Sequence, residues 1–189
     1  MTEPGPADFL TRLANKLSGA GVPYMVVGSF ASSFHGVPRS SQDLDLVIDP
    51  QLASLQSFLA SLSTDDYYAD GDAALEALNR RSQFNVIDMA TAWKADLIVR
   101  KTRPFSIEEM RRRVDADLLG VHVSVASAED TLIAKLEWAK QGGGSELQLR
   151  DASGIVQVRG GTLDHAYIKR WVAALGLEDL WQSVAAAFP

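Results

Sequence analysis

Cysteine is absent from this 189-residue sequence. That absence excludes a disulfide scaffold, a zinc ribbon, an iron–sulfur site and a thiol nucleophile. No apolar run approaches the roughly 18 to 20 residues that cross a bilayer. The start, MTEPGPADFL, also lacks the basic stretch and apolar core of a secretory leader. We therefore expect a cytoplasmic protein without a membrane-spanning segment.

Positive charge is in the minority. Lys and Arg total 18 against 24 Asp and Glu, which leaves a net charge of −6. This balance excludes a general nucleic-acid-coating protein, because a polyanion would have to bind at a local basic patch. Hydrophobic residues make up 47% of the chain, enough for a substantial core.

Hydrophobic periodicity predicts an α+β fold, with strands in the first two thirds and helices in the last third. Strands are expected at 23–27, 44–48, 84–89, 96–100 and 121–125. Helices are expected at 9–17, 29–34, 52–62, 72–80, from 106, from 127, and at 145–158, 163–175 and 178–187. The domain prediction is an α+β core at 7–126 with a helical C-terminal portion at 127–189 packed on it, after a start at 1–6 that frays.

Local signals predict how three helices begin. Asp49-Pro50 is typical of an N-cap followed by a first-turn proline. Ser106 with Glu109 is typical of a capping box, and Ser127 is expected to cap the next helix. The run of three glycines at 142–144 is the best hinge.

Two acids on one strand are the most informative feature. With a period of two, Leu44 and Leu46 face the core while Asp43 and Asp45 project together from the other side. Adjacent carboxylates repel each other unless a hard divalent cation lies between them, and Mg²⁺ prefers one or two carboxylates plus substrate phosphates.

A third acid would complete a two-metal site. Asp96 starts another predicted strand and faces away from its core side, while Asp88 lies on a further candidate strand, so either residue can be the third acid. One ion would activate an acceptor hydroxyl and the other would stabilise a leaving pyrophosphate. The plainer interpretation is that acids at strand edges cap turns or face water.

A turn of small residues precedes the acids. Gly28-Ser29 follows a strand and opens a short helix, which would offer backbone N–H groups and a hydroxyl to a triphosphate. The turn alone is a weak signal. Its position one short helix before the paired acids favours a nucleotide site.

These residues resemble a known superfamily. The matching run is Val27-Gly28-Ser29-Phe30-Ala31, then His35-Gly36-x-x-Arg39-x-Ser41-x-Asp43-Leu44-Asp45-Leu46-Val47. It is similar to the nucleotidyltransferases of DNA polymerase beta type, and more narrowly to the AbiEii-type toxin and minimal nucleotidyltransferase branch. The resemblance covers the chain to about Asp96 and implies a mixed sheet flanked by helices, with a helical C-terminal part.

The resemblance also implies roles for individual residues. Gly28, Ser29 and Arg39 would bind the NTP, and the metal ligands would be Asp43, Asp45 and Asp96, holding two Mg²⁺ ions, with Mn²⁺ as an alternative. Lys135 would meet phosphate, and the Arg150-Asp151 pair would complete the nucleotide site through Asp151. The alternative interpretations are a surface lysine at 135 and an ordinary helix carboxylate at 151. The short chain and its glycine run depart from the larger toxins, so acceptor specificity is not carried over.

Six basic residues cluster within 14 positions. We call them the basic strip: Arg100, Lys101, Arg103, Arg111, Arg112 and Arg113. They are either a docking strip for RNA or a solvated helix face screened by Glu108 and Glu109. His122 is expected to be exposed, while Trp138, Trp171 and Trp181 occupy core-like helix positions.

The first functional hypothesis is a Mg²⁺-dependent nucleotidyltransferase that moves NMP from an NTP to an acceptor hydroxyl and releases pyrophosphate. By resemblance it would be the toxin of a toxin–antitoxin pair, with a protein antitoxin as partner. The sequence leaves the acceptor open among RNA such as tRNA, a protein and a small molecule. A second hypothesis is a catalytically inactive nucleotide-binding or regulatory module. A third, a metal-dependent nuclease or phosphohydrolase, explains the acids but not the Gly28-Ser29 turn.

Overall fold

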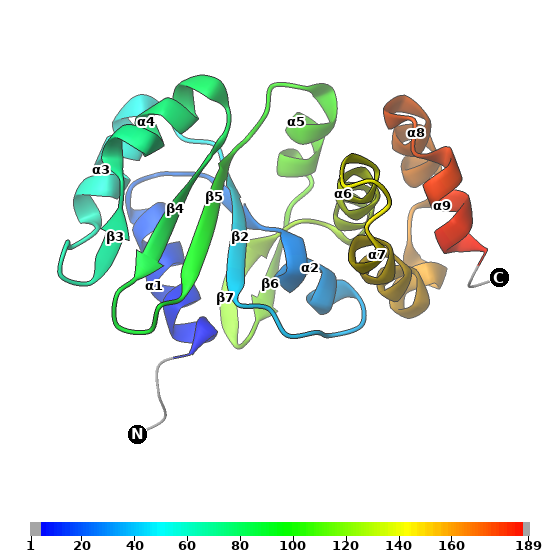
Figure 1. Ribbon diagram of the computed structural model, residues 1–189, viewed down its shortest axis with the longest axis horizontal. Coiled ribbons are helices and arrows are strands. Elements are labelled where there is room, and N and C mark those ends of the chain that lie inside the picture. The colour runs from blue at the N-terminus through cyan, green and yellow to red at the C-terminus, as the bar shows by residue number, and fades with distance from the viewer. Residues whose placement is uncertain (1–4, 187–189) are drawn as a thin grey trace. The chain divides into compact units, whose positions relative to one another are not determined.

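The computed structural model describes residues 5–186 (Figure 1). The expected fraying over 1–4 and the predicted helix end at 187 lie outside these residues, and Pro6 already opens the first helix. The helices are α1 (Pro6–Gly19), α2 (Gly28–His35), α3 (Leu52–Ser61), α4 (Gly71–Arg80), α5 (Pro104–Arg111), α6 (Ala128–Gln141), α7 (Glu146–Arg159), the 3₁₀ turn η1 (Gly160–Thr162), α8 (His165–Leu175) and α9 (Glu178–Ala185). The strands are β1 (Tyr24–Val26), β2 (Asp43–Ile48), β3 (Tyr67–Ala69), β4 (Gln83–Asp88), β5 (Lys94–Val99), β6 (Val114–Leu118) and β7 (Val121–Val125).

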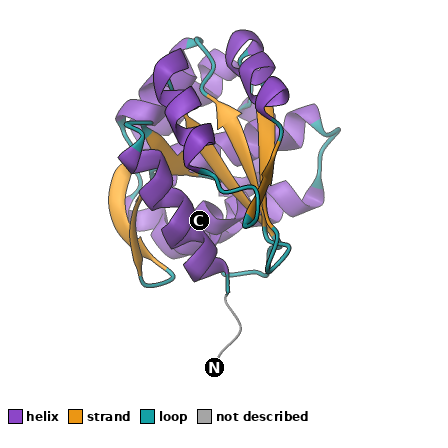
Figure 2. Ribbon diagram, turned by 90° about the vertical axis from the view of Figure 1, so that its left-hand side faces the viewer, coloured by secondary structure: helices purple, strands orange, loops and turns teal. Residues whose placement is uncertain are grey.

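The strands form one seven-stranded mixed sheet in the order β3-β4-β5-β2-β1-β7-β6. The β2/β5 and β1/β7 pairs are parallel and the other neighbours are antiparallel. The predicted α+β class, with a mixed sheet flanked by helices, is confirmed; Figure 2 distinguishes strands from helices by colour. Sequence patterns missed β3 and β6, the two edge strands. β3 is only three residues long, and β6 carries Asp115 and Asp117, which are depleted from strands in general.

Two predicted helix starts are wrong. Helix α3 has Gln51 at its N-cap, and the Asp49 carboxylate instead accepts a 2.8 Å hydrogen bond from Arg100 Nε. Helix α5 begins at Pro104, so Ser106 lies inside its first turn and accepts a 3.0 Å bond from Arg103 Nε. In both cases an arginine donates a hydrogen bond to the side-chain oxygen that would otherwise cap the helix.

The described residues divide into two compact units, residues 5–26 with 41–125 and residues 27–40 with 126–186. The first contains the sheet with α1, α3, α4 and α5; α1 packs on β7 and α3, and α4 packs on β4 and β5. Its core includes Leu44, Leu46 and Ile48 of β2, all buried. Within the described part of the chain, no helix combines the length and apolar character needed to span a membrane.

The second unit is helical and includes a segment from early in the sequence. Helix α2 packs on α6 and α7, and α6 also contacts α7, α8 and α9. Ser127 caps α6 as predicted, its Oγ accepting a hydrogen bond from the Asp130 backbone N–H at 3.1 Å. The core-like position predicted for Trp138 is wrong, because its residue surface is 58% exposed. The buried stripe of α6 passes through Leu132 and Leu136 instead.

Candidate functional site

Polar residues of the first unit gather on the face of the sheet opposite its buried leucines. Parallel pairing sets Asp43 opposite Lys94 and Asp45 opposite Asp96, and side chains directly opposite on neighbouring strands share a face. Antiparallel pairing adds Asn85 of β4, which lies opposite Asp96. The structure therefore brings the three predicted acids to one face of two adjacent strands, and we call Asp43, Asp45 and Asp96 the carboxylate cluster.

Asp88, the other candidate for the third acid, lies on the opposite face of the sheet. It is buried, and its position on β4 alternates with that of Asn85. Its carboxylate pairs with the Arg12 guanidinium of α1, which also donates a 3.1 Å bond to the Tyr67 hydroxyl. Asp88 thus ties α1 to the sheet, which leaves Asp96 as the third acid of this face.

Lys94 is a member of this face that the sequence analysis missed. Its Nζ lies 3.6 Å from Asp43 Oδ1 and 3.3 Å from both oxygens of Asp96. Burial lowers the pKa of Lys94, but the hydrogen bonds and negative charges of Asp96 and Asp43 outweigh burial, and the net pKa is raised. The signal was available, because Lys94 and Asp96 are two residues apart and strand alternation puts them on one face.

The carboxylate cluster has the chemistry of a site for a hard divalent cation, but its oxygens do not converge. Across residues 5–186, no three acidic or histidine side chains lie close enough together to hold a metal ion. Carboxylate oxygens are nevertheless the ligands that Mg²⁺ prefers. Asp96 Oδ1 is buried, and the contact that the structure gives it is the ion pair with Lys94. The donor set fits a cation, provided that the Lys94 ammonium moves.

In the second unit, the predicted phosphate-binding turn starts α2. Gly28 has φ +63°, in the left-handed region that favours glycine, and the helix follows directly. Val27 at the N-cap has no side-chain oxygen, so no side chain of the cap itself binds the first N–H groups of α2. Ser29 is buried in the first turn, and its carbonyl accepts a 3.1 Å bond from Ser32 Oγ.

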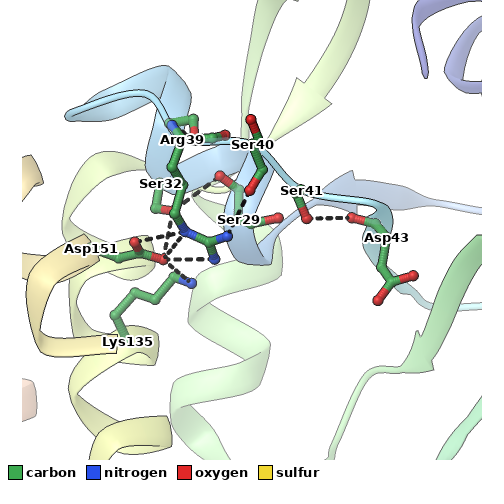
Figure 3. A network of polar contacts seen from close by, with 9 residues as sticks. Ser29, Ser32, Arg39, Ser40, Ser41, Asp43, Lys135 and Asp151 are labelled. Carbon is green, nitrogen blue, oxygen red and sulfur yellow. Dashed lines mark hydrogen bonds and ion pairs between the residues drawn. The ribbon is translucent and has the colours of Figure 1, made fainter. Parts of the chain in front are cut away.

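Two predicted residues of the second unit, Arg39 and Lys135, contact the carboxylate of a third, Asp151. We call these three residues the Asp151 cluster (Figure 3). Arg39 Nε donates to Asp151 Oδ1 at 2.9 Å, and Arg39 Nη2 donates to Oδ2 at 3.1 Å. Lys135 Nζ lies 2.8 Å from Oδ2, and Ser32 Oγ donates to the same atom at 3.3 Å. The side chains of Lys135 and Asp151 are only 6% and 4% exposed, so Lys135 is not the surface lysine of the alternative interpretation.

The Asp151 cluster carries an excess of positive charge. Burial raises the pKa of Asp151, but hydrogen bonds and charge from Arg39 and Lys135 outweigh burial and hold the pKa below its ordinary value. One carboxylate thus faces two cations, which suits a neighbouring anion. Arg150, the other half of the expected pair, is exposed.

The basic strip is partly occupied by contacts within the first unit. Arg100 binds Asp49, and Arg111 donates to both oxygens of Glu108 at 2.9 and 2.7 Å. Arg113 Nη1 donates to the Met110 carbonyl at 2.7 Å. These contacts of Arg100, Arg111 and Arg113 favour the interpretation of the strip as a solvated helix face.

His122 is exposed, as predicted, and its Nδ1 lies 3.2 Å from Asp117 Oδ1.

Comparison with solved structures shows which known fold this chain shares. A nucleotidyltransferase-like antigenic protein from Paracoccidioides brasiliensis matches with a TM-score of 0.59 and 18% identity, over 93% of this chain and 90% of its own. The chain has a nucleotidyltransferase-like fold. No protein-family model matches the sequence, and the search of curated proteins finds no relative.

Two antibiotic-modifying enzymes share the same fold. ANT(2'')-Ia in complex with adenylyl-2''-tobramycin matches with a TM-score of 0.56 and 12% identity, over 97% of this chain and 98% of its own. The lincosamide antibiotic adenylyltransferase LnuA, lincomycin-bound, matches with a TM-score of 0.53 and 11% identity, over 79% and 95%. The neighbours are thus proteins of nucleotidyltransferase type.

Proposed function

We propose that this chain is a divalent-metal-dependent nucleotidyltransferase that transfers NMP from an NTP to an acceptor hydroxyl. The observation that carries the proposal is the parallel register of β2 and β5, which sets Asp45 opposite Asp96 and brings Asp43 to the same face. A group of neighbouring carboxylates costs stability unless a cation offsets their repulsion. On a nucleotidyltransferase-like fold, we take that cation to be the metal bound to an NTP.

The carboxylate cluster would hold two Mg²⁺ ions, or Mn²⁺, through Asp43, Asp45 and Asp96. When bound, the ions would polarise the acceptor hydroxyl and neutralise the leaving pyrophosphate. Asp96 is the residue we assign to receive the acceptor's proton once its ion pair with Lys94 is broken. The acceptor oxygen then bonds to the α-phosphorus as the bond to the bridging oxygen of pyrophosphate breaks.

The second unit would bind the triphosphate. Backbone N–H groups at Gly28 and Ser29, at the start of α2, would bind the anion, and Lys135 would supply a point charge. Arg39, expected to bind substrate, has Nε and Nη2 on Asp151 and Nη1 on the Ser40 carbonyl. We therefore assign Arg39 and Asp151 to holding Lys135 in place.

The acceptor and the biological role extend this proposal. The sequence resemblance to the AbiEii-type branch supports a toxin that is neutralised by an antitoxin. The acceptor, which that resemblance does not fix, would be RNA, such as tRNA, or a protein. The bound molecules of two fold neighbours, lincomycin and adenylyl-tobramycin, support a small-molecule acceptor as the second candidate.

The test is label transfer from each α-³²P-labelled NTP, with Mg²⁺, into total RNA, lysate protein or small molecules. Asp43→Asn and Asp45→Asn should abolish transfer while the fold stays intact or melts slightly higher, because each change relieves carboxylate repulsion. Asp65→Asn, at an exposed position of the same unit, is the control. Metal-dependent NTP binding without transfer to any acceptor would support the inactive binding module, and release of nucleotides from RNA would support a nuclease.

A further inference from the structure

One positive charge already lies among the carboxylates of the sheet face. The Lys94 ammonium is 3.3 Å from Asp96, on its own strand β5, and 3.6 Å from Asp43, on the neighbouring strand β2. Parallel register sets Lys94 directly opposite Asp43, so the contact follows from the pairing of β2 and β5. The lysine bridges the two strands where their acids repel each other.

We propose that Lys94 is a built-in counter-ion that occupies the cation position of the carboxylate cluster in the metal-free protein and leaves it when a divalent cation binds. The inference rests on the proposed function, because it takes the cluster to be a metal site. It assigns to Lys94 a role in setting metal affinity and in keeping the metal-free sheet folded.

The geometry supports an exchange between lysine and metal. The Lys94 side chain is 34% exposed and has a flexible four-carbon stem, so its ammonium can swing into water. The Asp43 side chain is 52% exposed and can follow a new partner, whereas that of Asp96 is 17% exposed and stays in place.

Charge makes the two cations competitors. With Lys94 in place, the three carboxylates retain two of their three negative charges, and an incoming ion is repelled by an ammonium at short range. A bare metal ion must displace that ammonium into water. A metal delivered with a triphosphate brings negative charge that the released ammonium can pair with. Lys94 therefore favours the metal–NTP complex over the free ion.

The experiment titrates Mn²⁺ alone into the full chain by calorimetry, for the wild type, Lys94→Met and Lys94→Arg. Removal of a neighbouring positive charge should tighten Mn²⁺ binding by roughly tenfold or more, and Lys94→Arg should bind as weakly as the wild type. In EDTA, Lys94→Met should melt below the wild type, and Mn²⁺ should raise its melting temperature by more. Lys101→Met, which removes an exposed lysine beyond the end of β5, should change neither quantity.

A second measurement avoids the variants altogether. Reductive methylation of the wild type, followed by peptide mass spectrometry, reports how exposed the Lys94 amine is. Mn²⁺ should increase methylation of Lys94 and leave that of Lys101 unchanged. Equal Mn²⁺ affinity of the wild type and Lys94→Met, or unchanged methylation despite bound Mn²⁺, would overturn the inference while the proposed metal site stands. Lack of Mn²⁺ binding by all variants, with or without NTP, would overturn the metal site itself.

Discussion

Lys135 and Asp151 are polar residues that face inward at a cost. Each would be unstable if buried alone, and the pair is tolerated because the ammonium and the carboxylate lie 2.8 Å apart. The carboxylate also pairs with Arg39, so one negative charge faces two positive charges and does not neutralise Lys135 completely. The position of that charge makes it the most direct test of nucleotide binding by the second unit.

Lys135→Ala is predicted to weaken NTP binding by roughly tenfold, about 1.4 kcal/mol, because it removes the buried ammonium to which we assign phosphate binding. Lys140→Ala is the matched control on the same helix, since Lys140 donates to the Leu175 and Gly176 carbonyls at the end of α8. Calorimetric titration with Mg²⁺-NTP gives the affinities. Equal losses in the two variants would return Lys135 to a structural role.

His35 should make the second unit sensitive to acid. Its Nε2 donates to the Ala126 carbonyl at 2.7 Å, and burial lowers its pKa although that hydrogen bond and Glu129 act to raise it. The unfolded chain therefore takes up the proton first as the pH falls. The contribution of His35 to stability is complete above its ordinary pKa of 6.5 and is lost as the pH falls through the lowered value.

Urea unfolding between about pH 8 and about pH 5 should show the free energy of unfolding of the wild type falling with acidity. The slope should be smaller in His35→Gln, which keeps an N–H donor for the carbonyl but does not titrate. His122→Gln, at an exposed position, should keep the wild-type slope. The same slope in all three proteins would show that His35 does not contribute.

Strand alternation predicted the placement of individual acids well. It put Asp43, Asp45 and Asp96 on the face away from the core leucines, and β2 and β5 have that pattern. It gave no reason to join Arg39 to Asp151, because residues far apart in sequence meet only through the packing of α2 on α7. Pairwise ionic contacts of this kind depend on tertiary structure and leave no local pattern.

At the scale of the element, α2 and α7 approach through two glycines. A Cβ on Gly36 would lie 2.7 Å from the backbone C of Gly154, closer than real side-chain contacts. Gly36→Ala is therefore predicted to destabilise the protein by about 1 to 3 kcal/mol. Gly160→Ala is the control in the same unit, since its Cβ would meet only a Val156 methyl at 3.9 Å and its backbone is helical.

Chemical denaturation measures both glycine variants. Gly160→Ala should be neutral or slightly stabilising because it lowers the entropy of the unfolded chain. Equal stability of Gly36→Ala and the wild type would show that the helices separate without cost. NTP binding by Gly36→Ala is informative too, since Arg39 lies three residues beyond this contact.

Elements with their own hydrophobic period were predictable from the sequence, and elements defined by neighbours were not. Helix α1 has buried Phe9, Leu13 and Leu17 at helical spacing, and its existence was predicted from them. The edge strand β6 has only Leu118 buried, so its pairing with β7 defines it. Likewise, the local sequence predicted caps at Asp49 and Ser106 because it did not show their arginine partners. Arg100, which binds Asp49, is far away in the sequence, and Arg103, which binds Ser106, is not part of the capping motif.

At the scale of the whole molecule, net charge opposes the basic strip. Changing Arg111, Arg112 and Arg113 together to Glu is predicted to lower affinity for total RNA and to flatten its salt dependence, because each neutralised phosphate adds to the salt slope. NTP binding should be nearly untouched, since the proposed site would hold a compact Mg²⁺-triphosphate through short-range contacts. Filter binding at several salt concentrations measures the change. Parent-like RNA binding and modification would identify the strip as a solvated face and favour a protein or small-molecule acceptor.

The division of the chain has a consequence for how the protein is made. Residues 27–40 belong with helices that begin at 128, and Val26 pairs with Val125. On the ribosome, α2 therefore leaves the exit tunnel long before its partners α6 and α7 exist. Ala31 and His35, which are buried in the folded protein, stay exposed to water through most of synthesis. Strand β1 also lacks its parallel neighbour until β7 has been synthesised. Helix α2 therefore completes its packing only after α7 has been synthesised.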